Sequence, residues 1–523
     1  MNKAEKRSSR TIFLMIAATL VSKVLGMIRS MMTAWILGDS TEAVAFAAAS
    51  KIPGAIFDFL FSAAILGCFI PMYNYVKEKS EKDADRYSSA FITAVMAVCA
   101  VLSVLGIVFS RAIIKLAAPK ISEEAAKLAA ELLRIMFPMM IFTAGAYTLT
   151  GILQSAGKFI LPAMISAVSN AFMIFYLVIF KNSFSVYIFA LVYTLSWLLQ
   201  FLTLAIPLAV KKKLPKPTLD IKNEHLINSA KRIPNIMAGS WLVPASILMA
   251  SFFSSFVSET AFVAYDYANN VYSIISGVAV YGVGNFIFPA LSRFAAKNDE
   301  SSFSTSVKKA VFMIMFIILP VFAATFSLSD EIIRFLYLRG NFTEELAVEC
   351  ARALRFLSFA MPFLAASEIF SRTFYAQGKT RPPMYATLIA IIAATVSDIV
   401  LVIGFKGGLA GISVSFAVAQ IVQSIVLLIF AYRKIPGIFE KISVSNVLHL
   451  ASAFVLSLIT MTLLEKNMGI FTGLNLSLAI FLKISIVFIT GVVIYLLYIF
   501  VIKTISSKSG EKGAKKIDRK ETD

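Results

Sequence analysis

The chain has 523 residues, of which 59% are hydrophobic and 15% charged, with a formal net charge of +19 and a mean hydropathy of +0.81. A soluble protein of this length needs a large polar surface, which this composition cannot supply. Apolar runs of about 20 residues recur throughout, and a helix of that length crosses a bilayer. The alternation typical of membrane β-barrels does not occur. The sequence therefore predicts an all-α polytopic membrane protein.

Hydropathy and helix breakers together predict about fourteen transmembrane helices. The first follows basic residues, as a signal-peptide core does, but its apolar stretch is too long and lacks a small-residue cleavage site. We therefore interpret it as a helix. The approximate limits of the predicted helices are 11–37, 43–76, 88–110, 132–156, 159–180, 184–209, 233–257, 261–291, 310–328, 350–376, 384–404, 408–432, 445–464 and 476–502.

Lysine and arginine are concentrated in alternate loops, and this asymmetry predicts that both termini are cytoplasmic. An even number of helices is consistent with that orientation. The net positive charge then indicates attraction to an anionic inner leaflet, and not binding to nucleic acid. The basic segments include KAEKRSSR, KEKSEKDADR, KKKLPKPTLDIKNEH and KSGEKGAKKIDRK.

Enzyme chemistry has little support in this sequence. Cys68, Cys99 and Cys350 fall at or inside predicted helices, so no disulfide framework is implied. His225 and His449 lie at or near loops, and the chain has no Cys/His cluster, GxSxG motif or P-loop. We therefore expect a protein that is not an enzyme and has no resident cofactor or metal centre.

Two pairs of similar segments indicate a duplicated six-helix unit. FIPMYNYVKEKS resembles FIFPALSRFAAKN, and QSAGKFILPAM resembles YAQGKTRPPMY, at nearly the same interval along the chain. An even-numbered unit makes the halves parallel repeats, an architecture typical of transporters. A passive assembly scaffold is the alternative. The predicted organisation is an N-terminal lobe (1–210), a basic cytoplasmic linker (211–232), a C-terminal lobe (233–440), two additional helices (441–503) and a basic cytoplasmic tail (504–523).

Three cations lie inside the first two predicted helices. Lys23 and Arg29 are deep in the first, with no acidic neighbour on that helix, and Lys51 is in the second. A charge near the bilayer centre costs about 2.5–3.5 kcal/mol unless it faces water or a partner. Because arginine and lysine both suit phosphate, we expect a water-filled cavity that binds an anion. The alternative is that Asp58 and other carboxylates neutralise these cations.

Other charges inside the predicted helices have simpler interpretations. Arg134, Arg352 and Arg355 lie near helix ends, from which their side chains can reach the interface. Arg372 follows Glu368 by one helical turn, which predicts an intrahelical ion pair.

Asp398, in AATVSDIVLVIGF, is an intramembrane carboxylate with no basic residue close to it in sequence. Such a carboxylate is by default an ion or proton site. Ser413, on the following helix, can supply an oxygen ligand to Na⁺, so Na⁺ or H⁺ is the expected coupling ion. A hydrogen-bonded carboxyl that stays protonated is the alternative.

The motif SKVLGMIRS, followed by KIPG and CFIPMYNYVKEKS, resembles the opening of the MurJ/MviN lipid II flippases, in the multidrug/oligosaccharidyl-lipid/polysaccharide exporter superfamily. The resemblance continues through LLRIMFPMMIFTAGAYTLTGILQSAGKFILPA, SGVAVYGVGNFIFPALS, FLYLRGNFT and FYAQGKTRPPMYA, nearly to the end of the chain. It implies a V-shaped pair of lobes around a cationic cavity, with alternating access driven by membrane potential or a cation gradient. The implied cargo is lipid II, an undecaprenyl-pyrophosphate-linked peptidoglycan precursor, and the implied location is the bacterial cytoplasmic membrane.

The resemblance also implies site residues, and here the chain departs from the family. Lys23 and Arg29 match the first two cavity cations, whereas Ser30 replaces the acidic residue that usually follows. Phe57 and Asn270 stand where the family has cavity arginines. The last two helices would line a groove for the lipid tail, where Lys483 could meet the head group, although snorkelling to the interface is the simpler role for this lysine. The predicted substrate-binding residues are Lys23, Arg29, Lys51, Ser22, Ser30, Asn270 and Lys483, and the predicted cation-binding residues are Asp398 and Ser413.

The missing cavity arginines leave several functions open. A Wzx-like exporter of another undecaprenyl-linked oligosaccharide is the principal alternative. A multidrug/cation antiporter prefers a carboxylate-rich cavity, and a non-transporting cell-wall scaffold needs no cavity. The two-lobe design suggests a functional monomer among membrane lipids.

Overall fold

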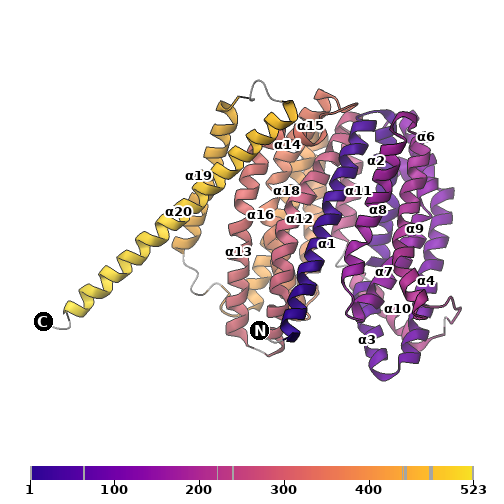
Figure 1. Ribbon diagram of the computed structural model, residues 1–523, viewed down its shortest axis with the longest axis horizontal. Coiled ribbons are helices and arrows are strands. Elements are labelled where there is room, and N and C mark those ends of the chain that lie inside the picture. The colour runs from indigo at the N-terminus through magenta and orange to yellow at the C-terminus, as the bar shows by residue number, and fades with distance from the viewer. Residues whose placement is uncertain are drawn as a thin grey trace.

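The protein is a bundle of long helices, with no strand among the residues described by this computed structural model. Figure 1 shows the N-terminal lobe, the C-terminal lobe and a pair of C-terminal helices side by side, with both chain ends toward the same end of the bundle. The described residues are 3–62, 65–220, 222–237, 241–297, 299–438, 440, 444–469 and 475–520.

The N-terminal lobe begins with α1, which packs along α8. Serine caps begin several of its helices, since the hydroxyls of Ser40, Ser80 and Ser122 accept hydrogen bonds from backbone N–H groups of the first turn. Its elements are α1 (Lys3–Leu37), α2 (Thr41–Phe57), the π-helices η1 (Asp58–Ser62) and η2 (Ile65–Phe69), α3 (Ile70–Lys79), α4 (Glu81–Val108), α5 (Ser110–Ala117), α6 (Glu123–Met136), α7 (Met139–Ser155), α8 (Ile160–Ile179), the 3₁₀ turn η3 (Lys181–Ser183) and α9 (Val186–Val210).

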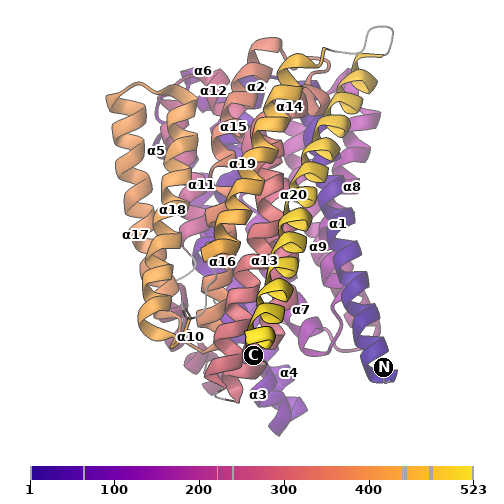
Figure 2. The same ribbon diagram turned by 90° about the vertical axis from the view of Figure 1, so that its left-hand side faces the viewer.

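The C-terminal lobe repeats this arrangement, and α19 and α20 pack against its helix α13 (Figure 2). The elements after the N-terminal lobe are α10 (Glu224–Met237), α11 (Leu242–Ser255), α12 (Glu259–Ala296), α13 (Glu300–Ser327), α14 (Ser329–Tyr337), α15 (Glu344–Ser358), α16 (Met361–Ala376), α17 (Arg381–Asp398), the π-helix η4 (Ile399–Gly404), α18 (Gly408–Lys434), α19 (Val444–Asn467) and α20 (Leu476–Lys520).

The predicted polytopic helical fold is confirmed. Within the described residues, ten helices are long and apolar enough to cross a membrane, and the number is twelve if each of two bent pairs is one span. These pairs are α6–α7, bent by 44°, and α15–α16, bent by 45°, each of which the sequence predicts as one helix. The other two predicted helices coincide with α11, whose apolar part is short, and with α12.

The two bent pairs occupy equivalent places in the two lobes, and one side-chain contact recurs at both. The Arg134 Nε–H donates to Ser110 Oγ over 2.9 Å, and the Arg355 Nε–H donates to Ser329 Oγ over 3.0 Å. Each contact joins the first helix of a bent pair to the short helix before it, α5 or α14. The sequence predicts that both arginines reach the interface, but serine hydroxyls hold their side chains instead. The recurrence of the same contact in both lobes supports the predicted parallel repeat.

The repeated QSAGK and YAQGK motifs form the same turn in both lobes. Gly157 follows α7 with φ of +71°, and Gly378 follows α16 with φ of +68°. Left-handed backbone of this kind favours glycine, because a Cβ would approach the following carbonyl oxygen. The motif similarity therefore has a structural basis.

The predicted linker is partly helical. Its helix α10 packs on the N-terminal lobe, where Ser229 and Tyr87 share a hydrogen bond of 2.7 Å. The sequence predicts that the seventh helix begins at residue 233, whereas α10 continues to Met237 and α11 begins at Leu242. Residues 238–240 of that predicted helix lie outside the described residues.

Candidate functional site

A cavity of about 550 Å³ lies between the lobes. The N-terminal lobe contributes lining residues from α1, α2, α7 and α9, and the C-terminal lobe contributes from α11, α12, α16 and α18. The π-helix η1 begins at this cavity with Asp58, after Pro53 and Gly54 in α2. Wider π turns often mark functional positions within helices. Residues of both lobes therefore form the walls of this cavity.

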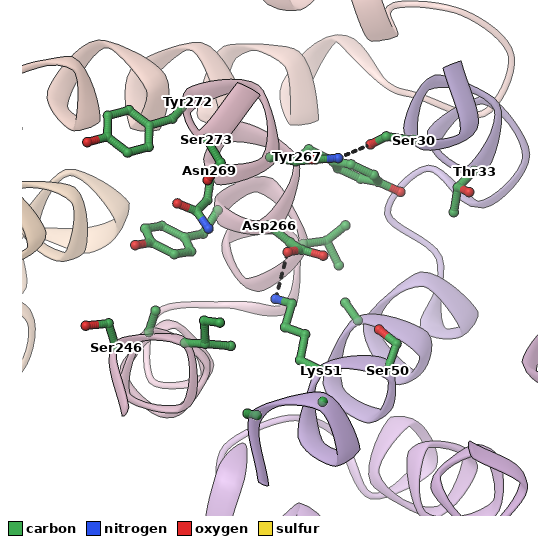
Figure 3. A pocket seen from close by; sticks show the side chains of 18 of the residues that line it. Ser30, Thr33, Ser50, Lys51, Ser246, Asp266, Tyr267, Asn269, Tyr272 and Ser273 are labelled. Atoms are coloured by element: carbon green, nitrogen blue, oxygen red, sulfur yellow. Dashed lines mark hydrogen bonds and ion pairs between the residues drawn. The ribbon is translucent and has the colours of Figure 1, made fainter. Parts of the chain in front are cut away.

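Lys51 crosses this cavity to the opposite lobe. Its Nζ lies 2.8 Å from Asp266 Oδ1, so that an ion pair joins α2 to α12 (Figure 3). The two side chains retain 24% and 34% exposure. A partly exposed pair of this kind has modest strength and can exchange partners. The sequence-based alternative of neutralisation by carboxylates is thus correct for Lys51, although the partner is Asp266 and not Asp58.

Arg29 lines the same cavity from α1, as predicted. Its Nη1 lies 3.9 Å from the sulfur of Met173, which is a weak acceptor. No carboxylate within salt-bridge distance of Arg29 occurs among the described residues. Most of the guanidinium donors therefore stay available to an anionic ligand.

Ser30 and Asn270 meet across the lobes at the cavity wall. The Asn270 Nδ2–H donates to Ser30 Oγ over 2.6 Å, the dashed bond drawn to Ser30 in Figure 3, and Ser30 Oγ lies 3.0 Å from the hydroxyl of Tyr337 on α14. These positions are where the resemblance places an acidic residue and an arginine. The two departures from the family pattern are therefore in contact, as a neutral pair in place of a charged one.

The cavity wall also carries carboxylates. Asp58, Asp266 and Glu368 line it together with the cations Arg29 and Lys51. Glu368 is engaged with Arg372, whose Nε lies 2.7 Å from Glu368 Oε1, which confirms the predicted intrahelical pair. The field in the cavity is therefore less positive than three unpaired cations would produce.

Two predicted substrate contacts on α1 lie outside the cavity lining. Lys23 is partly buried on α1 but does not line this cavity. The Ser22 hydroxyl donates to the carbonyl oxygens of Ala18, at 2.9 Å, and Ala163, at 3.2 Å. Ser22 therefore joins α1 to α8, which is a packing role.

Lys483 also lies away from the cavity. Only 7% of Lys483 is exposed, and its Nζ is 2.6 Å from Glu331 Oε1 on α14. A second glutamate, Glu465 of α19, lies 3.5 Å from the same ammonium. The expected snorkelling and head-group contact are incompatible with this burial, because both need an accessible ammonium.

Asp398 is buried at the end of α17, where η4 begins, with 4% exposure. Its Oδ1 and the Ser415 hydroxyl oxygen are both buried, and Ser415 is the side-chain hydrogen-bonding neighbour of this carboxyl. Ser413 instead donates to the carbonyl oxygen of Leu409 over 3.2 Å. No group of three or more His, Cys, Asp and Glu side chains suited to a metal ion occurs in the described part of the chain. A cation site at Asp398 and Ser413 stays a prediction.

A backbone contact closes one end of the interlobe space. Trp35, Ile36, Gly38, Gly340 and Asn341 form what we call the interlobe latch. The Asn341 backbone N–H donates to the carbonyl oxygen of Trp35 over 2.9 Å. The side-chain amide of Asn341 donates to the carbonyl oxygen of Ile36 over 2.6 Å. A Cβ on Gly38 would lie 2.0 Å from Asn341 O. Only glycine permits this close approach between the lobes.

Sequence reasoning missed Asp266, Glu331 and Glu465 as functional candidates. Asp266 is visible as an intramembrane carboxylate, and the unpaired cations of the first lobe are the signal that could have indicated its role. Glu331 and Glu465 lie just beyond the limits of the predicted helices, so they do not count there as intramembrane charges.

The sequence comparisons with known proteins agree on one family. The family model described as lipid II flippase MurJ matches residues 33–501. A probable lipid II flippase MurJ of Bdellovibrio bacteriovorus is 26% identical over 446 residues, 84% of each chain. The corresponding protein of Aquifex aeolicus is 26% identical over 455 residues, 85% of this chain and 87% of the relative.

Solved structures show the same fold. A lipid II flippase MurJ in an inward closed conformation aligns with a TM-score of 0.78 and 23% identity, covering 94% of this chain and 100% of that chain. An inward-facing multidrug resistance MATE family transporter aligns with a TM-score of 0.64 and 15% identity, covering 82% of this chain and 99% of the transporter chain. The MATE likeness is one of fold alone. Because the family model spans most of the chain, this protein belongs to the lipid II flippase MurJ family.

Proposed function

We propose that the protein translocates lipid II from the inner to the outer leaflet by alternating access. The observation that carries this proposal is the cavity between two repeated lobes, in which Arg29 has no carboxylate partner among the described residues. A pyrophosphate needs such a donor, because charge-assisted bonds from a guanidinium fit phosphate oxygens. The names of the curated relatives support this cargo.

In this mechanism the cargo competes with a protein carboxylate. The pyrophosphate binds Arg29 and displaces Asp266 from Lys51, so the ion pair that joins α2 to α12 opens when cargo enters. The interlobe latch then separates, and the lobes close on the opposite side. The polyprenyl tail stays in lipid, along the groove proposed for α19 and α20.

We further propose that a membrane potential or cation gradient drives the reset of this cycle, with Asp398 and Ser413 as the candidate ion site. One charge moving through 100 mV supplies about 2.3 kcal/mol, which is enough to bias two lobe arrangements. The protein acts as a transporter without catalysis, as a monomer in the bacterial inner membrane with both termini cytoplasmic.

Rescue of a bacterium depleted of its own lipid II flippase tests this function. Wild-type protein should restore lipid II exposure on the outer leaflet, and Arg29→Ala should abolish that exposure at equal membrane abundance. Arg352→Ala is the matched control, because Arg352 is half-exposed and pairs with Glu349 away from the cavity. An Arg29→Ala variant that transports fully contradicts the cationic-site mechanism.

A second cargo has support from one observation. The Ser30–Asn270 contact is neutral where the family resemblance implies charge, which would suit a different undecaprenyl-linked oligosaccharide. A wild-type chain that inserts well but does not restore lipid II exposure would favour this Wzx-like function.

A further inference from the structure

A buried ionic cluster joins the added helices to the C-terminal lobe. Lys483 of α20 lies 2.6 Å from Glu331 of α14 and 3.5 Å from Glu465 of α19. The side chains of Lys483 and Glu331 are 9% and 8% exposed, and that of Glu465 is 22% exposed. The second oxygen of Glu331, Oε2, is buried without a hydrogen-bond partner among the described residues. The cluster therefore has an unused acceptor in its most buried part.

The charges of this cluster do not balance when both carboxyls are ionised. Two carboxylates and one ammonium leave one negative charge, and burial of an uncompensated charge is costly. The neighbouring side chains offer little compensation, because Ile332, Leu464 and Ile484, adjacent in sequence to the three charged residues, belong to an apolar cluster with Leu328, Met461 and Val487. A polar pair on α13 and α19, Ser327 and Thr462, is satisfied by a mutual hydrogen bond of 2.9 Å.

The other charged groups nearby are engaged elsewhere or exposed. Arg334 of α14 forms ion pairs with Asp330 and Glu344. Arg339 donates to the carbonyl oxygen of Phe335 and to Ser477. Lys466 is solvent-exposed at the end of α19, and the charged residues of α13 lie in its first half. Among the described residues, no second cation is therefore placed to neutralise the cluster.

We propose that Glu331, Glu465 and Lys483 form a binding site for one proton. A proton from water converts one carboxylate to a carboxylic acid, whose O–H donates to the other carboxylate, and the site becomes neutral. Glu465, the more exposed of the two glutamates, is the entry point. Since the carboxyls share one ammonium, the proton belongs to the pair and not to either residue alone.

This site is linked to the cavity through α14, and the consequence for transport rests on the proposed function. Glu331 and Tyr337 are six residues apart on α14, about 9 Å along a helix. Tyr337 contacts Ser30 at the cavity wall. Binding or release of the proton changes how firmly α20 holds α14, and so couples the outer helices to the wall of the cavity.

Infrared difference spectroscopy of the full chain in lipid nanodiscs, recorded across a pH titration, tests proton binding without any cargo. Wild-type protein should show a carboxylic acid C=O band that disappears as the proton leaves. Glu465→Gln and Glu331→Gln should each lose this band, because one carboxylate with one ammonium is already neutral. Two separate variants keep the test decisive if one of them fails to fold.

Glu349→Gln is the matched control, because Glu349 forms a one-to-one pair with Arg352 at 2.8 Å, and its band pattern should equal that of wild type. A wild-type titration without the band, or the same set of carboxylic acid bands in wild type and in both glutamine variants, overturns the proposal. Suppression of the band by Na⁺ at constant pH would also overturn it in favour of a metal cation. Failure of lipid II rescue with the band intact would instead count only against the proposed cargo.

Discussion

Substitution of Gly340 by alanine should weaken the interlobe latch selectively. Gly340 has φ of +59°, and a Cβ at this position would lie 1.7 Å from Cδ1 of Trp35 and 2.6 Å from the Trp35 carbonyl oxygen. The indole ring can turn about its side-chain torsions, but the carbonyl oxygen belongs to the backbone and cannot rotate away. The lobes must therefore separate locally, and the two hydrogen bonds from Asn341 to Trp35 and Ile36 are lost with the contact.

The free-energy change between the closed and open arrangements of the lobes depends only on the terms in which they differ. Alanine in left-handed backbone costs about 1–2 kcal/mol, but this cost is present whether the lobes are closed or open, so it cancels from the equilibrium between them. The lost hydrogen bonds contribute about 0.5–1.5 kcal/mol each. The latched state should thus lose about 1–3 kcal/mol, a shift of roughly 5- to 150-fold toward the open state.

Thiol accessibility measures this shift. A cysteine introduced at Ser273, an exposed residue of the cavity wall on α12, reports on access to the cavity (Figure 3). The native cysteines, all buried, give little background. A membrane-impermeant maleimide added on the latch side should label Ser273→Cys faster in the Gly340→Ala background.

Gly378→Ala is the matched control, because Gly378 has a similar φ of +68° but no atom within 4 Å of an added Cβ. It carries the same backbone strain without the overlap, so its labelling rate should equal that of wild type. Equal rates in Gly340→Ala and Gly378→Ala would refute the reasoning that the latch holds the lobes together.

Two predictions concern the cavity itself. Asp266→Asn should raise the affinity for undecaprenyl pyrophosphate about fivefold in nanodisc binding assays. In this variant the ligand need not break the Lys51–Asp266 ion pair, which is worth ~1 kcal/mol. An unchanged affinity would mean that Lys51 does not contact the phosphate. Asn270→Arg should impair rescue by placing an unpaired guanidinium against the Ser30 hydroxyl, and addition of Ser30→Asp should restore it. Equal impairment in the single and double variants would contradict a direct partnership.

The helical framework was predictable because its signals are local. Apolar runs of bilayer length, turn glycines such as Gly157 and Gly378, and the one-turn spacing of Glu368 and Arg372 each depend on residues close together in sequence. The same holds for the duplication, which leaves similar motifs at equal intervals. Arg29 as a cavity cation also belongs here, because an arginine deep in an apolar helix requires an aqueous or polar neighbour.

The partners of the other charges were decided by tertiary packing. Lys51 meets Asp266 only because α2 and α12 approach each other across the lobes, and Lys483 meets Glu331 only because α20 packs beside α14. Hydropathy identifies a costly buried charge but contains no information about which distant helix neutralises it. An ion pair depends on the direction and distance of two side chains, and between helices far apart in sequence those quantities exist only once the lobes have packed.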